Sequence, residues 1–292
     1  MDNLWKHGRI QTEILFVCQK LGVEAKQEYR GNGWRADVFA PNDSRPIAFE
    51  VQLSPQSLNK TLERQSKYAR DGVFGCWLFE KPIAKLTNER PDLPVFYVEE
   101  DEDLGLMVNL GTRRKVDLHF FLENFICNNI QFRTIAHTSF KQIVRLAFYE
   151  MICWNCGQLN HLYYVETPFL SSCNAKIQPK EALWASNSIE YKDEIMELAS
   201  NLARSKKEPN FTLGTVKERY SRMVGKSYLS FGCLSCDSIF GDFHVMEAKM
   251  DNMYDPNRIS LEGEIELNEP FNLNIPHWCL PGDGKFCGGH KS

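Results

Sequence analysis

The sequence lacks any apolar run near the roughly 18 residues that a membrane-spanning helix needs, so we expect no membrane segment and no membrane partner. Residues 1–7 lack the basic-then-apolar order of a secretory signal, and we therefore expect a cytoplasmic protein. The net charge is low, −4 at pH 7, so nucleic-acid binding would need a local basic patch. The stretch Gly225-Lys226-Ser227 lacks the earlier glycine of a phosphate-binding loop, because Tyr220 stands there, which excludes an ATPase of that class.

The 292 residues have the composition of a globular protein, with 43% hydrophobic and 25% charged residues. This length suggests two domains. We predict an α/β domain over residues 1–125 and a second domain over residues 126–250. Residues 251–292 are acidic and rich in glycine and proline, so we expect a poorly packed tail.

Periodicity assigns most of the first domain to regular elements. Apolar residues at helical spacing predict a helix over residues 10–21, and period-two alternation predicts a hairpin of strands over residues 34–39 and 47–53. A polar helix and three strands follow, over residues 58–70, 73–79, 95–98 and 104–110. Beyond them we expect helices over residues 116–125, 140–151 and 188–204.

The hairpin carries the clearest candidate for chemistry. Glu50 and Gln52 share one face because side chains alternate along a strand, and the neighbouring strand brings Asp37 beside them. Two convergent carboxylates suit a hard cation such as Mg²⁺, which activates water and neutralises charge on a phosphodiester. A solvated sheet face without catalysis is the alternative. His7, on the first helix, either reaches this site or lies at the surface.

The helix over residues 58–70 carries a stripe of positive charge, because Lys60, Arg64 and Lys67 are four and three residues apart. Such a stripe suits phosphate contacts, and Arg64 with Tyr68 could clamp a nucleic-acid backbone and stack on a base. A solvated helix face explains the same pattern, so both interpretations stay open.

Four runs within residues 5–80 form one spaced pattern: Arg35-Ala36-Asp37-Val38, Ile47-Ala48-Phe49-Glu50-Val51-Gln52-Leu53-Ser54, Arg64 with Tyr68, and Gly75-Cys76-Trp77-Leu78. The pattern resembles the nuclease domain of competence protein CoiA-like proteins, which belong to the PD-(D/E)xK nuclease superfamily. The resemblance implies a restriction-endonuclease-like α-β-β-α-β core in residues 1–125. It implies that Asp37 and Glu50 bind Mg²⁺ or Mn²⁺, that Gln52 replaces the superfamily's lysine, and that Glu28 is a further acidic site residue.

The same resemblance implies a metal-dependent nuclease that hydrolyses phosphodiester bonds, with DNA as the expected substrate, in bacterial competence, repair or defence. Gln52 departs from the usual lysine, although it agrees with the Glu-x-Gln variant of this branch. A glutamine amide is neutral and can only orient water or phosphate. Lys60 or Lys67 could supply the missing charge, or remain surface lysines. The second hypothesis is therefore a nucleic-acid-binding or scaffold protein that keeps the nuclease fold without catalysis.

Two Cys-x-x-Cys pairs predict a structural zinc site, because four thiolates form the tetrahedral set that Zn²⁺ prefers. The pairs are Cys153 with Cys156 and Cys233 with Cys236. Cys233 follows Cys156 by 77 residues, whereas a zinc ribbon usually has about 15 to 20 between its halves. We therefore predict a C-terminal zinc-ribbon-like domain with a helical insertion. Buried cysteines without metal are the alternative.

The other cysteines have no such spacing. We expect four of them to pack as small hydrophobic residues, namely Cys18, Cys76, Cys127 and Cys173. Two alternatives remain for four residues near the C-terminus, a second small metal site or a loose tail that carries cysteines. The residues are His277, Cys279, Cys287 and His290.

Overall fold

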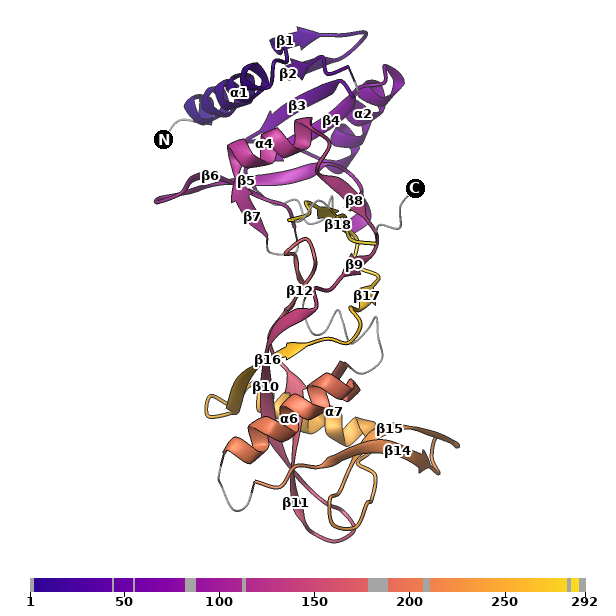
Figure 1. The fold of residues 1–292 in the computed structure, drawn as a ribbon. Helices are drawn as coiled ribbons and strands as arrows, with labels where there is room; N and C mark the ends of the chain where they lie inside the picture. The colour runs from indigo at the N-terminus through magenta and orange to yellow at the C-terminus, as the bar shows by residue number, and fades with distance from the viewer. Residues whose placement is uncertain are drawn as a thin grey trace. The chain divides into compact units, whose positions relative to one another are not determined.

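The computed structural model describes residues 3–43, 45–54, 56–81, 88–111, 114–177, 189–206, 211–282 and 285–288. The chain forms two compact units (Figure 1). Unit 1 comprises residues 1–136, 172–175 and 274–292, and unit 2 comprises residues 137–171 and 176–273. These boundaries differ from the predicted domains because the chain returns to unit 1 after unit 2. Among the described residues, no helix has the length and hydropathy that crossing a membrane requires.

Unit 1 is built on a mixed seven-stranded sheet whose strands lie in chain order. The chain-order neighbours β3, β4 and β5 are parallel, and the remaining neighbours are antiparallel. The predicted mixed α/β character is thereby confirmed. The strands are β1 (Lys26–Arg30), β2 (Arg35–Ala40), β3 (Ile47–Gln52), β4 (Phe74–Phe79), β5 (Val95–Asp101), β6 (Gly105–Asn109) and β7 (Lys115–Asp117).

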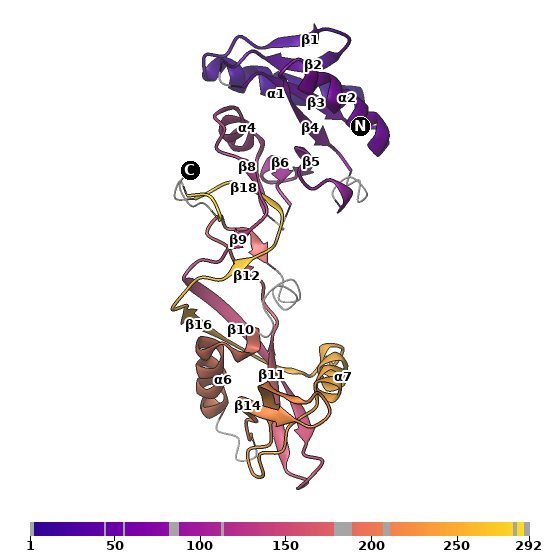
Figure 2. The ribbon, with the colours of Figure 1, turned by 90° about the vertical axis from the view of Figure 1, so that its right-hand side faces the viewer.

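Helices cover both faces of this sheet (Figures 1 and 2). On one face, α1 (Asn3–Lys20) and α4 (Leu118–Ile126) bury their apolar stripes in one core with β2 to β6. On the other face, α2 (Leu58–Arg70) buries Tyr68 against β2, β3 and β4. The helix α2 begins where we predicted, because the Ser57 hydroxyl accepts a hydrogen bond from the backbone N–H of Lys60 at 3.4 Å.

Unit 2 centres on an antiparallel sheet in the order β11-β10-β16. The expected helix over residues 140–151 is instead the strand β10 (Lys141–Ile152). Its buried side chains alternate from Gln142 through Val144 to Leu146, and both its edges pair, with β11 (Leu159–Val165) and β16 (Ile259–Glu266). Pairing on both sides supplies hydrogen bonds and packing that outweigh a helical interpretation of the same apolar residues.

Helices and a hairpin complete unit 2. The predicted helix over residues 188–204 is α6 (Asp193–Ser205), preceded by the short helix η1 (Ile189–Tyr191). It packs on β16 where Gly263 leaves room for Leu198, while α7 (Asp242–Met253) lies against β10 (Figure 2). The basic stretch after residue 216 forms the hairpin of β14 (Thr215–Ser221) and β15 (Lys226–Gly232).

The described part of residues 251–292 is packed, unlike the loose tail that we expected. After β16 comes β17 (Asn272–Leu273), and β18 (His277–Cys279) pairs with β8 (Gln131–Arg133) in unit 1. The ring of Trp278 is buried 5.3 Å from that of Phe96. The composition of this segment is polar, but its few apolar side chains, such as Trp278, pack against residues far away in the sequence, which composition alone does not show. The remaining short strands are β9 (Ala136–His137), β12 (Phe169–Leu170) and β13 (Lys176–Ile177).

Candidate functional site

The two predicted carboxylates lie where the β2–β3 ladder ends. The last antiparallel pair is Val38 with Phe49, so Asp37 and Glu50 are the next residues on their strands. There the Asp37 side chain takes over the role of a ladder carbonyl, since its Oδ2 accepts the backbone N–H of Val51 at 2.8 Å. The two carboxylates therefore lie next to each other just past the last residue pair of this ladder.

Glu50 is held in an almost closed environment, with a side chain that is 2% exposed. Arg64 and Tyr68 of α2 both donate hydrogen bonds to its Oε1. Burial raises the pKa of Glu50 to about 7; the Arg64 charge opposes this increase and the Asp37 charge adds to it. A cation that bound both carboxylates would offset this penalty, because its charge would replace the stabilisation that the carboxylate of Glu50 loses when water is excluded.

Tyr68 differs from our expectation of a base-stacking residue, because it is fully buried. Its ring lies between those of Trp34 and Trp77, at centroid distances of 5.1 and 6.3 Å. Burial also raises the pKa of Tyr68, so its hydroxyl stays protonated and can donate to Glu50. Tyr68 therefore orients the carboxylate rather than a base.

The basic residues of α2 do not all lie at the carboxylate pair. Arg64 is 28% exposed, contacts Glu50 and stacks over the Trp77 ring at 5.0 Å. Lys60 is exposed, whereas Lys67 forms an ion pair with Glu63 at 2.8 Å. Solvent screening weakens an exposed pair of this kind, so a phosphate group can compete for Lys67.

The fold brings His7 to the site, which is one of the two positions that the sequence left open for it. Its Nε2 lies 3.4 Å from Oδ2 of Asp37, with the His7 side chain 30% exposed. The only signal in the sequence was its position one turn before Ile10 on the buried stripe of α1. The fold thus adds an imidazole beside the first carboxylate.

Glu28 lies opposite Asp37, between the register pairs Gln27 with Val38 and Tyr29 with Ala36. Its backbone has a φ of 53°, a left-handed conformation that is uncommon outside glycine. Its carboxylate pairs with Arg35 and accepts a hydrogen bond from Gln11 at 3.3 Å. Glu28 therefore flanks the carboxylate pair, and its own charge is compensated by Arg35.

Gln52 occupies the position of the expected lysine at the end of β3. Its amide nitrogen donates to the carbonyl of Ser54 at 2.9 Å, so the side chain is turned toward the following loop. The side chain is half-buried. In this conformation Gln52 supports the loop, and a rotation about its side-chain bonds would be needed for it to orient a water molecule.

The donor set suits an oxygen-preferring cation. Among the described residues, the hydrogen bonds to this pair use Oδ2 of Asp37 and Oε1 of Glu50, which leaves the second oxygen of each carboxylate for a ligand role. Mg²⁺ and Mn²⁺ are bound in this manner, by one or two carboxylates with water completing the shell.

A second candidate centre lies in unit 2, where the two Cys-x-x-Cys pairs converge as predicted. The Sγ atoms of Cys153 and Cys236 are 3.5 Å apart, and those of Cys156 and Cys233 are 3.6 Å apart. Tetrahedral zinc with Zn–S bonds of about 2.3 Å requires sulfur separations of roughly 3.8 Å. Each pair sits in a tight turn, in which the first cysteine's carbonyl accepts the backbone N–H four residues later, at 2.9 and 3.0 Å.

Asn160 supports this cysteine cluster from β11. Its side-chain amide donates to the Sγ of Cys233 at 3.6 Å, and its carbonyl oxygen accepts the backbone N–H of Leu234 at 2.9 Å. Such hydrogen bonds stabilise thiolate ligands and hold their orientation. The cluster is therefore compatible with a structural zinc site.

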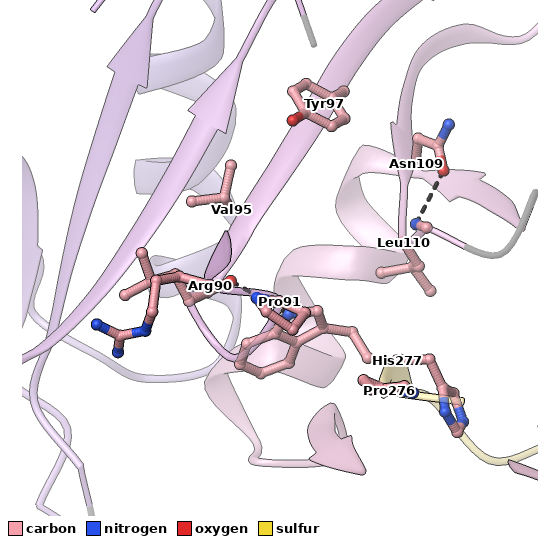
Figure 3. Close-up of a pocket in the computed structure, with 11 residues that line it drawn as sticks. Arg90, Pro91, Val95, Tyr97, Asn109, Leu110, Pro276 and His277 are labelled. Atoms are coloured by element: carbon pink, nitrogen blue, oxygen red, sulfur yellow. Dashed lines mark hydrogen bonds between the residues drawn. The ribbon is translucent and has the colours of Figure 1, made fainter. Parts of the chain in front are cut away.

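Unit 1 also contains a small pocket of about 120 Å³ between β5, β6 and the C-terminal segment (Figure 3). Arg90, Tyr97, Asn109 and His277 are among its lining residues, whereas neither Asp37 nor Glu50 is. The pocket is thus separate from the carboxylate pair.

A family model for the competence protein CoiA, nuclease-like domain, matches residues 7–152, which is half of the chain. No curated protein and no solved structure matches. The matched segment contains the carboxylate pair and α2, and it ends one residue before Cys153. The four-cysteine cluster therefore lies outside it.

Proposed function

The chain belongs to the family of the competence protein CoiA nuclease-like domain, and we propose that it is a Mg²⁺- or Mn²⁺-dependent nuclease of PD-(D/E)xK type that hydrolyses phosphodiester bonds in DNA. The observation that carries this proposal is the position of Asp37 and Glu50 at the end of the β2–β3 ladder. One carboxylate is half-buried and the other is buried with a raised pKa. This is a suitable environment for a divalent cation and unfavourable for two uncompensated negative charges.

In this proposal Asp37 and Glu50 hold the cation through the oxygens that their hydrogen bonds leave available. The bound cation would supply an activated water molecule and neutralise charge on the phosphodiester. Tyr68 and Arg64 fix the rotamer of Glu50, and the backbone N–H of Val51 fixes that of Asp37. Rigid placement of both ligands keeps the site in the geometry that hydrolysis needs.

Positive charge around the pair comes from residues other than a lysine on β3. His7 lies beside Asp37, and Arg64, which is 28% exposed, contacts Glu50. The charged form of His7 would neutralise part of the negative charge on the scissile phosphate. The neutral amide of Gln52 cannot make this contribution. Lys60 and Lys67 would contact the nucleic-acid backbone farther along α2. Glu28 would complete the acidic edge of the site.

The cysteine cluster of unit 2 has a supporting role in this proposal. Cys153, Cys156, Cys233 and Cys236 would bind structural Zn²⁺ in a zinc-ribbon-like arrangement, with η1, α6 and β14 inserted between its two halves. Thiolates select zinc whereas the carboxylate pair selects magnesium or manganese, so the two centres would differ in metal.

The test is incubation of the full-length protein with labelled single- and double-stranded DNA and RNA, with Mg²⁺, with Mn²⁺ and with neither. Cleavage of DNA only with added metal is expected. Asp37→Asn should reduce the rate by more than about 100-fold, because it removes a negatively charged ligand of the cation that would neutralise the transition state. The matched control Asp103→Asn, in the exposed turn between β5 and β6, should cleave like the wild type. Circular dichroism checks that both variants fold.

A binding protein without catalysis is the second candidate, and the hydrogen bond between Gln52 and Ser54 favours it. In that case Arg64 and Tyr68 would stabilise a vestigial Glu50. Wild-type protein that binds labelled DNA but cuts no nucleic acid with either metal would establish this alternative. An Asp37→Asn variant that cleaves at the wild-type rate would show that the site is placed wrongly.

A further inference from the structure

We propose that Cys173, His277, Cys279 and Cys287 bind a second structural Zn²⁺ ion inside unit 1. The ligand atoms of these four residues all lie within 4.8 Å of one another. All four residues are buried, with exposed fractions of 4% or less. Cys173 is buried, as the sequence predicted for a packing residue, but it packs beside His277, Cys279 and Cys287. His290 lies outside the described residues.

His277 provides the strongest evidence for a ligand. Its Nδ1 lies 2.9 Å from the backbone carbonyl of Ile275, a contact that requires Nδ1 to carry the proton and donate it. The other ring nitrogen, Nε2, is buried and has no hydrogen-bond partner among the residues that the structure describes. A buried imidazole nitrogen without a partner costs free energy unless something binds its lone pair. Metal-ligating histidines typically show this arrangement, with one nitrogen held by a carbonyl and the other on the metal.

The cysteines are arranged as thiolate ligands rather than as a disulfide. None of the ten cysteines in the chain forms a disulfide bond. The backbone N–H of Cys287 donates to the Sγ of Cys279 at 3.3 Å, and the Ser172 hydroxyl lies 3.3 Å from the Sγ of Cys287. Hydrogen bonds of this kind compensate thiolate charge. Three soft sulfur donors with one imidazole select Zn²⁺ over Mg²⁺.

A buried set of four protein ligands leaves no open position for substrate, so the ion would be structural. Its ligands come from separate parts of the chain: Cys173 from the segment between β12 and β13, and the others from β18 and the residues after it. Arg114 donates to the backbone carbonyls of both Cys173 and Leu280, so the same two segments are already held together beside the cluster.

The ion would therefore complete unit 1. Trp278 stands between two ligands of the cluster and packs into the core beside Phe96 and Phe132. Figure 3 shows His277 and Pro276 in the C-terminal segment that lines the pocket beside β6. Closing a ligand set over about 100 residues is entropically unfavourable for the unfolded chain, so zinc binding here contributes directly to folding.

Metal content and ligand type test this proposal in full-length protein purified without chelator. Elemental analysis should find two zinc ions per chain. X-ray absorption at the zinc edge should fit seven sulfurs and one imidazole nitrogen shared between the two ions. Cys233→Ser should keep one zinc with three sulfurs and one nitrogen, and Cys279→Ser should keep one with four sulfurs. Cys127→Ser, an exposed cysteine outside both clusters, is the matched control and should keep two.

The wild-type measurements need no variant to fold, so they test the proposal even if Cys279→Ser aggregates. One zinc per chain with sulfur ligands only would overturn it. So would an intact mass two daltons low with a disulfide mapped between any of Cys173, Cys279 and Cys287, or Cys233→Ser protein that contains no zinc.

Discussion

The burial of Glu50 makes a quantitative prediction for the variant Glu50→Gln. Burial raises the pKa of this carboxyl from its ordinary 4.5 to about 7 in the folded protein. Below pH 4.5 the group is neutral in both states. Between pH 4.5 and 7 the unfolded chain releases the proton that the folded chain keeps, so the folded state loses stability as the pH rises. Above pH 7 the full penalty of about 3 kcal/mol is present.

Glutamine has nearly the same shape and no charge, so Glu50→Gln should remove this pH dependence. In buffer without added Mg²⁺, the free energy of unfolding of the wild type should fall by about 3 kcal/mol more than that of the variant as the pH rises from 4 to 8. The variant should also lose metal-dependent cleavage. Chelator is omitted so that any metal bound by the cysteine clusters is retained. Equilibrium urea unfolding measures the difference, with tryptophan fluorescence as the probe because Trp34 and Trp77 pack against Tyr68.

Glu63→Gln is the matched control, since Glu63 is an exposed glutamate on α2. The hydrogen bond and charge of Lys67 lower the pKa of Glu63, so its small effect should have the opposite sign. Parallel stability curves for the wild type and Glu50→Gln from pH 4 to pH 8 would contradict this prediction. They would mean that Glu50 is solvated or already paired with a permanent cation.

Three further predictions concern the neighbours of the pair and the first zinc cluster. Tyr68→Phe removes one hydrogen bond to a charged oxygen, so unfolding in urea at pH 8 should show a loss of roughly 1.5–3 kcal/mol, larger than at pH 5; equal losses would contradict this. His7→Ala should slow cleavage by ~10-fold with the fold intact, as initial rates will show, whereas an unchanged rate would leave His7 a surface residue. Cys233→Ser should lose one zinc and expose residues 150–171 and 176–245 of unit 2 to protease while the strands of unit 1 resist; full zinc content would exclude the four-cysteine site.

Local patterns were sufficient for the core of the site. The alternation around Asp37 and Glu50 and the cap at Ser57 are each determined by neighbours in sequence, so the β2–β3 hairpin and α2 could be predicted within two residues of their observed bounds. Which face of α2 packs against the sheet was harder to predict. The charged stripe was identified from the sequence, but the roles of Thr61 and Tyr68, which are buried, depend on contacts with the sheet.

Contacts between distant segments account for the errors. The apolar residues of β10 fit a helix as well as a strand until β11 and β16 pair with both edges. Cys173 has no metal-ligand spacing to any other cysteine, and only the return of the chain after unit 2 brings it to Cys279. The polar composition around Trp278 likewise hides a side chain that lies in the core of unit 1.

The most direct test of the central claim is anomalous diffraction at the manganese edge from crystals of the wild-type protein soaked in Mn²⁺. We expect one manganese ion bound by both Asp37 and Glu50, at the metal–oxygen distances of about 2.0–2.2 Å that hard divalent ions of this size adopt. The same peak should be absent from Asp37→Asn crystals. Manganese bound elsewhere with both carboxylates unligated, or an undiminished peak in the variant, would contradict the claim that this pair is the catalytic metal site.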